Sequence, residues 1–191
     1  MVPRQQQSGF SLAELLVAMF VAVALYAMFV GPSRAFLQRQ KLERCAENLR
    51  KLHMVLSLYA NEHDGAFPAA DGACASDDVF AALVPRYTSD RSFFACPATG
   101  HSGETRADFA YVAGLRKDGD ASLLASDAQV NTEPKLHGVK LFADVEGIRG
   151  GNHGKAGGNL LFTDGRVETI GTEAPRDISP PPGAKLLNPT Q

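Results

Sequence analysis

Side chains able to ligate a metal or move a proton gather in the C-terminal half of the chain: Asp144, Glu146, His153 and Asp164. Carboxylates and an imidazole are the residue types needed for a metal site or for acid–base catalysis. Nothing in the sequence fixes them in space, because Asp164 belongs to a turn motif and His153 lies in a glycine-rich loop. We therefore expect no catalytic residue and no enzyme activity, with His153 hydrogen-bonded or solvated.

Two further segments have the composition of ligand-binding loops but lack the residues that such loops require. Asp118 and Asp120 begin like a calcium loop, yet Leu123 stands where glycine is needed and Gln129 where Glu is needed. Residues 150–158 contain five glycines but do not have the pattern of a phosphate-binding loop. The sequence therefore predicts neither kind of loop.

The N-terminal segment predicts a membrane-spanning helix. Within residues 10–30 only Ser11 and Glu14 are clearly polar, and about 20 apolar residues suffice for one helical crossing of a bilayer. A carboxylate in such a helix costs about 2.5–3.5 kcal/mol at the bilayer centre and less near an edge. We therefore expect Glu14 to have a partner of opposite charge.

Composition limits the rest of the chain to one small domain. About 160 residues follow the apolar segment, which is enough for a modest core. The formal net charge is −2 with both signs scattered along the chain, so there is no basic face of the kind that dominates nucleic-acid affinity. We expect no nucleic-acid partner.

An amphipathic helix is predicted after the apolar segment. Its apolar residues recur at helical spacing and form a seam: Leu42, Cys45, Leu49, Leu52, Leu56 and Tyr59. We expect this seam to pack on the chain's own sheet, because about three heptads are short for a coiled coil. The pattern predicts one long helix from about Ser11 to His63, interrupted at Gly31-Pro32 and ended by Asp64-Gly65.

A short helix and several strands are predicted beyond the long helix. Asp77 and Asp78 are the expected N-caps of a helix over residues 79–84, and apolar or aromatic runs predict strands over residues 109–113, 139–143, 159–163 and 166–170. Asp164-Gly165 suits a two-residue type I′ hairpin turn, in which both positions need positive φ. The proline-rich residues 171–191 are expected to be disordered or to form an extended strap.

The three cysteines are Cys45, Cys74 and Cys96. They form no C-x-x-C pair and have no zinc-like spacing, so in an oxidising compartment they indicate one disulfide and one free thiol. The closer spacing and loop context favour Cys74 with Cys96, although the connectivity cannot be read from sequence.

The hydrophilic leader, residues 1–9, ends in a junction that resembles a class III prepilin signal. The apolar segment follows the Gly9–Phe10 junction, and Glu14 lies four residues beyond Phe10. The resemblance implies cleavage between Gly9 and Phe10 by a prepilin peptidase, N-methylation of Phe10, and pairing of Glu14 with the Phe10 amine of a neighbouring subunit. The alternative is an uncleaved signal anchor in which Glu14 has no partner.

Charge and resemblance disagree about orientation in the membrane. Arg4 is the only basic side chain of the leader, whereas Arg34, Arg39, Lys41 and Arg44 follow the apolar segment, and a count of lysine and arginine would place the C-terminal side in the cytoplasm. The resemblance implies the opposite: a single-pass protein of the bacterial inner membrane, with a cytoplasmic N-terminus and a periplasmic head.

Further segments resemble type II secretion pseudopilins of the G type and the prepilin-like family with a C-terminal His-spacer-Asp-Gly motif. They are residues 45–68, Phe94 to Pro97, and His153 to Gly165, in which ten residues instead of nine separate His153 from Asp164. The resemblance implies an α+β, pilin-like fold, with the long N-terminal helix packed on a small antiparallel sheet. It also makes Cys45 with Cys96 a rival disulfide.

The implied domains are the leader (1–9), a transmembrane helix (10–31), the amphipathic half of the long helix (32–63), an α+β head (64–170) and the proline-rich tail (171–191). The implied function is that of a pseudopilin, a structural subunit of a type II secretion or type IV pilus-like filament. Its expected partners are the prepilin peptidase/methyltransferase, copies of itself and other pseudopilins, the inner-membrane assembly platform and membrane lipid.

No cofactor is expected apart from calcium, which G-type pseudopilins often bind in a head loop and whose ligands have no residue-by-residue counterpart in this chain. One alternative is a minor or surface pilin whose head binds a ligand, a surface or DNA. A weaker one is a membrane-anchored periplasmic enzyme or metal-binding protein.

Overall fold

The computed structural model describes residues 11–69, 72–100, 102–104, 106–128, 151–171 and 181–190. The chain divides into two compact units, Met1–Leu37 and Gln38–Gln191. Several predictions fall outside the described residues: the leader with its Gly9–Phe10 junction, the strand over residues 139–143, and the side chains of Asp144 and Glu146.

The long helix α1 (Leu12–Glu62) has the predicted bounds to within one residue at each end. It is continuous through Gly31-Pro32, where the sequence predicted an interruption. A proline inside a helix removes one N–H donor, yet α1 runs as one helix of 51 residues.

Ser11 and Glu14 form a capping box at the start of α1. The Ser11 hydroxyl accepts a hydrogen bond from the Ala13 N–H (3.2 Å), and the Glu14 carboxylate accepts one from the Ser11 N–H (2.9 Å). This reciprocal arrangement satisfies donors that have no partner inside the helix. Glu14 therefore has an intrachain role that its position in an apolar segment did not predict.

The first part of α1, Leu12–Phe29, is long and apolar enough to cross a membrane. Its mean hydropathy is 2.3 over 18 residues and none of it is buried within the chain. An α-helix of that length spans about 27 Å, close to the thickness of a bilayer's hydrocarbon core. This length and composition fit a membrane anchor or a signal sequence.

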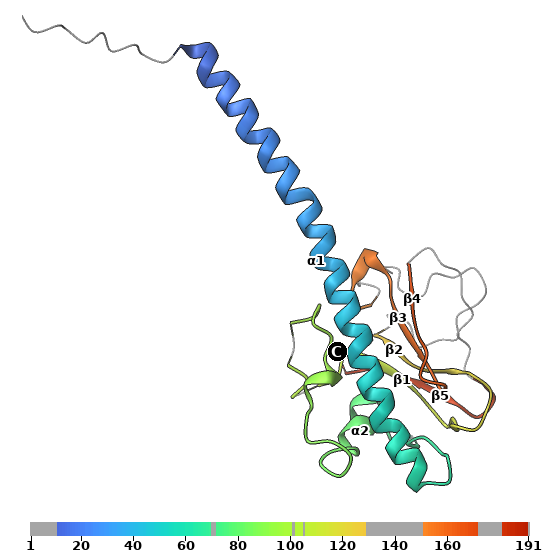
Figure 1. Ribbon diagram of the computed structural model, residues 1–191. Helices are drawn as coiled ribbons and strands as arrows, with labels where there is room; N and C mark the ends of the chain where they lie inside the picture. Colours follow the sequence, from blue (N-terminus) through green and yellow to red (C-terminus); the bar gives the residue numbers. More distant parts are fainter. Residues whose placement is uncertain are drawn as a thin grey trace, which may run out of the picture. The chain divides into compact units, whose positions relative to one another are not determined.

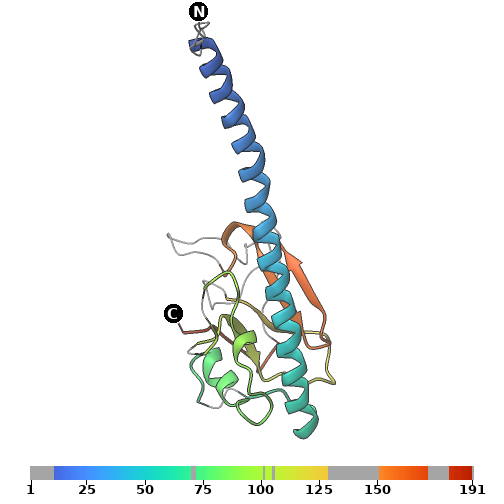
Figure 2. The ribbon, with the colours of Figure 1, turned by 60° about the vertical axis from the view of Figure 1, so that its left-hand side comes forward.

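The second part of α1 packs on a sheet of the same chain. Cys45, Leu49, Leu52 and Leu56 of the predicted seam have no exposed surface, and they share one core cluster with residues of the strands, among them Tyr111. Figures 1 and 2 show this part of the helix running alongside the strands. The expectation that the seam packs on the chain's own sheet is confirmed.

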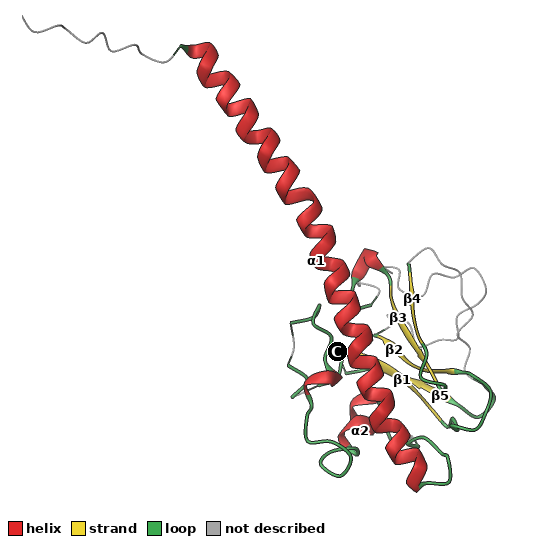
Figure 3. Ribbon diagram, viewed as in Figure 1, coloured by secondary structure: helices red, strands yellow, loops and turns green. Residues whose placement is uncertain are grey.

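The sheet has five antiparallel strands in the order β4-β3-β2-β1-β5 (Figure 3). They are β1 (Phe109–Ala113), β2 (Leu123–Asp127), β3 (Gly158–Phe162), β4 (Val167–Ile170) and β5 (Lys185–Leu187). The predicted strands over 109–113, 159–163 and 166–170 correspond to β1, β3 and β4, and the α+β class is confirmed. Strand β2 was not predicted.

In strand β5, part of the proline-rich tail is ordered and extended, which agrees with the strap alternative and not with disorder. Leu187 is 2% exposed and lies opposite Tyr111 on β1. The Lys185 ammonium donates a hydrogen bond to the Ala73 carbonyl (3.1 Å). These residues follow the last of the clustered prolines, so their N–H groups are free to join the edge of the sheet.

The β3–β4 hairpin is confirmed, but its turn is not of type I′. The Phe162 N–H donates to the Arg166 carbonyl (2.9 Å) and the Gly165 N–H donates to the Phe162 carbonyl (3.0 Å). Gly165 has φ 87°, whereas Asp164 does not have positive φ. The turn is therefore a three-residue loop with glycine in the left-handed region, and the Asp164 carboxylate accepts the Arg166 N–H (2.9 Å).

The short helix α2 (Ser76–Ala81) begins earlier than predicted. Asp77 and Asp78 lie in its first turn instead of capping it. The Asp78 carboxylate accepts the N–H groups of Cys74 (3.0 Å) and Ala75 (3.1 Å), which fixes the start of the helix before the aspartates. The Asp77 carboxylate accepts the Thr190 N–H (2.7 Å) and so holds the end of the described chain against α2.

Replacing Leu52 with alanine tests the packing of the seam. We expect Leu52→Ala to lower the free energy of unfolding by about 2–5 kcal/mol, because it leaves a cavity between α1 and the sheet. Leu58→Ala is the matched control, since Leu58 lies on the same helix and is 53% exposed. Urea unfolding of the full chain in detergent, followed by circular dichroism, measures both; equal shifts of the two midpoints would contradict the packing.

Candidate functional site

Four side chains with metal-ligating atoms meet inside the second unit. Cys45 comes from α1, Cys96 follows the 3-10 helix η1 (Ser92–Phe94), Asp127 ends β2, and His153 precedes the 3-10 helix η2 (Gly154–Ala156). All four are buried, and one ligand atom from each lies within 4.8 Å of those of the others. We call these four residues the Cys-Asp-His cluster.

The two cysteines of the cluster form a disulfide. Cys45 and Cys96 have Cα atoms 5.2 Å apart, within the usual range for a disulfide, and Cys74 is free and exposed. The pairing favoured by spacing, Cys74 with Cys96, is therefore not the one in the structure, whereas the pairing implied by the family resemblance is. Spacing failed because the buried face of α1 brings Cys45 to Cys96 from far away in the sequence.

Asp127 is a buried carboxylate held by several donors. One oxygen, Oδ2, accepts the Asn159 N–H (2.7 Å) and the Asn159 side-chain amide (3.1 Å), and the other, Oδ1, accepts the Asn152 amide (3.0 Å). The Cys45 Sγ lies 3.1 Å from Oδ1. A Cys45 thiol can donate a hydrogen bond across this distance, but a disulfide sulfur has no proton to donate.

His153 lies between Cys96 and Asp127. Its Nε2 is 3.3 Å from the Cys96 Sγ and 3.6 Å from the Asp127 Oδ2. Its Nδ1 is buried and has no hydrogen-bond partner within the part of the chain that the structure describes. A buried, unpartnered ring nitrogen is uncommon in folded proteins and needs an explanation.

Burial moves both titratable groups of the cluster toward their neutral forms. It raises the pKa of Asp127 to about 7, although the hydrogen bonds from Asn159 and Asn152 act in the opposite direction. It lowers the pKa of His153 to about 4, with a further contribution from the positive charge of Lys41. At neutral pH the imidazole is therefore uncharged, and its contact with Asp127 is not an ion pair.

A small cavity lies beside residues that contact the cluster. Its volume is about 220 Å³, and its walls include Asn152 and Asp108. Asn152 donates to Asp127 (3.0 Å), and the Asp108 carboxylate accepts the Cys96 N–H (3.0 Å). The cavity thus reaches the residues that surround the cluster.

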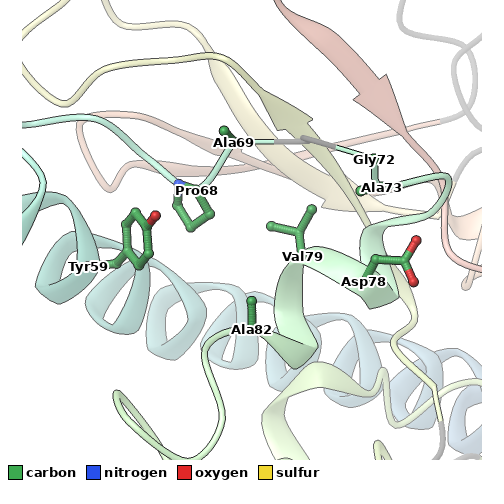
Figure 4. Close-up of a pocket in the computed structure, with 8 residues that line it drawn as sticks. All are labelled: Tyr59, Pro68, Ala69, Gly72, Ala73, Asp78, Val79 and Ala82. Atoms are coloured by element: carbon green, nitrogen blue, oxygen red, sulfur yellow. The ribbon is translucent and has the colours of Figure 1, made fainter.

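A second cavity, of about 320 Å³, lies between α1 and α2 (Figure 4). Most of the residues that line it have apolar side chains: Tyr59, Pro68, Ala69, Gly72, Ala73, Asp78, Val79 and Ala82. The carboxylate of Asp78 already accepts two backbone N–H groups. Among the described residues that line it, no group besides this carboxylate could carry acid–base or metal chemistry except the Tyr59 hydroxyl.

The structure describes two of the four candidate chemical residues, His153 and Asp164, and does not bring them together. Of the four candidate chemical residues, His153 enters the cluster, whereas Asp164 is exposed in the hairpin turn. That turn packs on α1, because a Cβ on Gly165 would come within 2.8 Å of the His53 ring. Asp118, of the rejected calcium loop, pairs with Arg116 at 3.0 Å.

Sequence reasoning missed Asp127 and the asparagines that hold it. Asp127 ends a strand that the sequence did not predict, so no pattern marked it as buried. The available signal was indirect: Cys45, Cys96 and His153 all lie within the segments that carry the family resemblance.

Cysteine alkylation tests the Cys45–Cys96 disulfide. After air oxidation with a chelator present, the denatured chain should carry one alkylated cysteine, Cys74, and reduction should raise the number to three, because Cys45 and Cys96 protect each other. Peptide mass spectrometry measures this. Reduction should also lower the free energy of unfolding by about 2–5 kcal/mol, whereas Cys74→Ser should not change it. A peptide linking Cys74 to Cys96 would contradict the structure.

Comparison of the chain with protein-family models, with curated proteins and with solved structures found no match.

Proposed function

We propose that the chain is a pseudopilin, a structural subunit of a type II secretion or type IV pilus-like filament in the bacterial envelope. The observation that carries the proposal is a single helix, α1, that begins with an apolar stretch able to cross a membrane and continues as the helix against which the head folds. The segment before and at its start, from Ser8 to Glu14, has the residue order of a prepilin junction.

The apolar surface of α1 needs a cover. Large side chains from Leu12 to Phe29 are exposed, with Leu12 at 78% and Phe20 at 75%. A continuous apolar surface of this kind is rare on a soluble monomer and marks a membrane or protein contact. Lipid before assembly and neighbouring α1 helices within a filament would supply that cover.

Glu14 would have two successive roles in this proposal. In the isolated chain it completes the capping box with Ser11 (2.9 Å). After cleavage at Gly9, the methylated amine of Phe10 would carry a positive charge one residue before Ser11, and Glu14 of an incoming subunit would pair with the Phe10 amine of its neighbour. Such a pair would reduce the cost of burying either charge.

The disulfide supports an exported head. Disulfides persist in the periplasm and are rare in the bacterial cytoplasm, so the Cys45–Cys96 bond favours a cytoplasmic N-terminus and a periplasmic head over the orientation that the count of lysine and arginine predicts. The inner-membrane assembly platform and the prepilin peptidase/methyltransferase are the partners that this topology requires.

The N-terminus of the mature chain tests the proposal directly. Expressed with a prepilin peptidase, the chain should have an intact mass that begins at methylated Phe10. Gly9→Leu should block cleavage, because a side chain there obstructs the approach of the protease to the backbone. A mature N-terminus at Met1 or beyond Val30 would contradict the prepilin interpretation.

Glu14→Gln tests the assembly role separately. Glutamine also suits the third helical position of a capping box, so the helix, membrane insertion and cleavage should be retained while the charge is lost. We expect processed protein to remain in the inner membrane, with crosslinked oligomers reduced at least tenfold. Glu43→Gln, an exposed glutamate on the same helix, is the control.

Normal filament assembly by processed Glu14→Gln protein as the sole copy would refute the charge pairing. The location of the assembled protein then separates the two filament types. Accumulation in the envelope with loss of secreted enzymes on deletion would favour secretion, and recovery from sheared cell surfaces would favour a pilus.

A further inference from the structure

The Cys-Asp-His cluster has the donor set of a zinc site. Two sulfur atoms, one imidazole nitrogen and one carboxylate oxygen are ligand types that Zn²⁺ binds in tetrahedral sites. With Zn–S of about 2.3 Å and Zn–N or Zn–O of about 2.0–2.2 Å, neighbouring donor atoms in such a site lie roughly 3.3–3.8 Å apart. Two pairs in the cluster already lie in that range: Cys96 Sγ is 3.3 Å from His153 Nε2, and His153 Nε2 is 3.6 Å from Asp127 Oδ2. The Cys45 Sγ lies 3.1 Å from the other carboxylate oxygen, Oδ1.

The donors come from four separate parts of the second unit, Gln38–Gln191. Cys45 is on α1, Cys96 on the loop after η1, Asp127 on β2 and His153 before η2, and all four are buried. A metal site assembled in this way is held by the fold and not by a short sequence motif. This explains why cysteine spacing alone gave no indication of zinc.

The surroundings of the cluster fit a metal ligand at Asp127. Asn159 donates to Asp127 through its backbone and its side chain, and it also donates to the Leu42 carbonyl of α1 (3.0 Å). Outer contacts of this kind orient carboxylate ligands and raise metal affinity. Asn152, which donates to Asp127 (3.0 Å), also lines the cavity of about 220 Å³.

The disulfide and a metal ion cannot occupy the cluster together. The sulfur atoms ligate zinc as thiolates, and in the structure they are joined to each other. We propose that the dithiol form of the chain binds one Zn²⁺ through Cys45, Cys96, Asp127 and His153, so that disulfide formation and metal binding are alternative states of the same site.

The exchange between these states balances as a two-electron reaction. A dithiol reductant gives two electrons and two protons to the Cys45–Cys96 bond, which becomes two thiols, and the reductant becomes a disulfide. Zn²⁺ then replaces the two thiol protons, which pass to solvent. In the reverse direction, transfer of two electrons from the thiolates to a disulfide oxidant re-forms the Cys45–Cys96 bond and releases Zn²⁺, while the oxidant takes up two protons.

This site is independent of the filament function. The proposed site gives the chain two cross-linked forms, one with the Cys45–Cys96 disulfide and one with bound Zn²⁺. In both forms the cross-link connects α1 to the sheet. A chain that has not yet been oxidised would hold α1 in place through the metal.

Cobalt titration of the full chain in detergent tests the proposal. The chain is reduced with a phosphine under anaerobic conditions and titrated with Co²⁺, which reports tetrahedral sulfur ligation by charge-transfer and intense visible absorption. We expect one Co²⁺ per chain, displaced by one Zn²⁺ and lost when a disulfide oxidant is added. Chain left oxidised should show no such absorption.

Variants locate the site within the chain. His153→Ala and Asp127→Asn should weaken Co²⁺ binding at least tenfold, and Asn159→Ala should weaken it about tenfold through the orientation of Asp127. Cys74→Ser and His63→Ala remove a cysteine and a histidine outside the cluster and should leave binding unchanged. Circular dichroism of each reduced variant shows whether it is folded.

If the variants fail to fold, Co²⁺ uptake by the reduced wild-type chain still decides the proposal. A reduced wild-type chain that takes up no Co²⁺ would overturn the proposal, whether it stays folded or unfolds. Equal binding by the oxidised chain, or loss of binding in Cys74→Ser, would also overturn it.

Discussion

The buried carboxylate of Asp127 is the contact on which the polar interior of the head depends. It accepts hydrogen bonds from Asn159 of β3 and from Asn152. Asn159 in turn donates to the Leu42 carbonyl on α1 and accepts the Thr169 hydroxyl of β4 (2.7 Å). The side chains of Asp127 and Asn159 thus connect α1 with β2, β3 and β4 through hydrogen bonds. Loss of the Asp127 carboxylate would leave several buried donors without a partner.

This network lies where α1 attaches to the sheet, so a cross-link at Cys45 affects the mechanical strength of that attachment. Cys45 and Leu42 lie on the part of α1 that faces the sheet, and in the proposed filament α1 carries the contacts between subunits. A force applied along α1 would act first on the attachment of the helix to the head. A cross-link at Cys45 resists that force more than apolar packing alone, because separating the helix from the sheet would then require breaking a covalent or metal–ligand bond.

Much of the fold follows from local sequence patterns. The bounds of α1, its buried seam, β1 and the β3–β4 hairpin were all predictable, because each depends on periodicity or on turn residues within a short segment. The dipeptide Asp164-Gly165 shows the limit of local patterns. It predicted the β3–β4 hairpin correctly, but it predicted a two-residue type I′ turn where the structure has a three-residue loop. The backbone of Gly165 and its contact with His53 depend on how the turn meets α1.

The candidate site was less predictable because its members meet only in three dimensions. Asp127 lies at the end of β2, a strand in which serine and aspartate replace part of the apolar pattern, and those polar side chains are buried because the core supplies their hydrogen bonds. Cys74 and Cys96 are closer in sequence, yet Cys74 is exposed. Long-range packing, not spacing along the chain, decides which cysteine reaches Cys96.

Strand β5 has a consequence for the order in which the head is built. Strand β1 is buried along its whole length and pairs with β5, which lies far later in the sequence. Until Leu187 has been synthesised and β5 has paired with β1, one edge of β1 presents unpaired N–H and C=O groups. An exposed edge of this kind on an apolar strand can pair with other chains. A chain halted before that residue would therefore be prone to aggregation, because the sheet cannot be closed without β5.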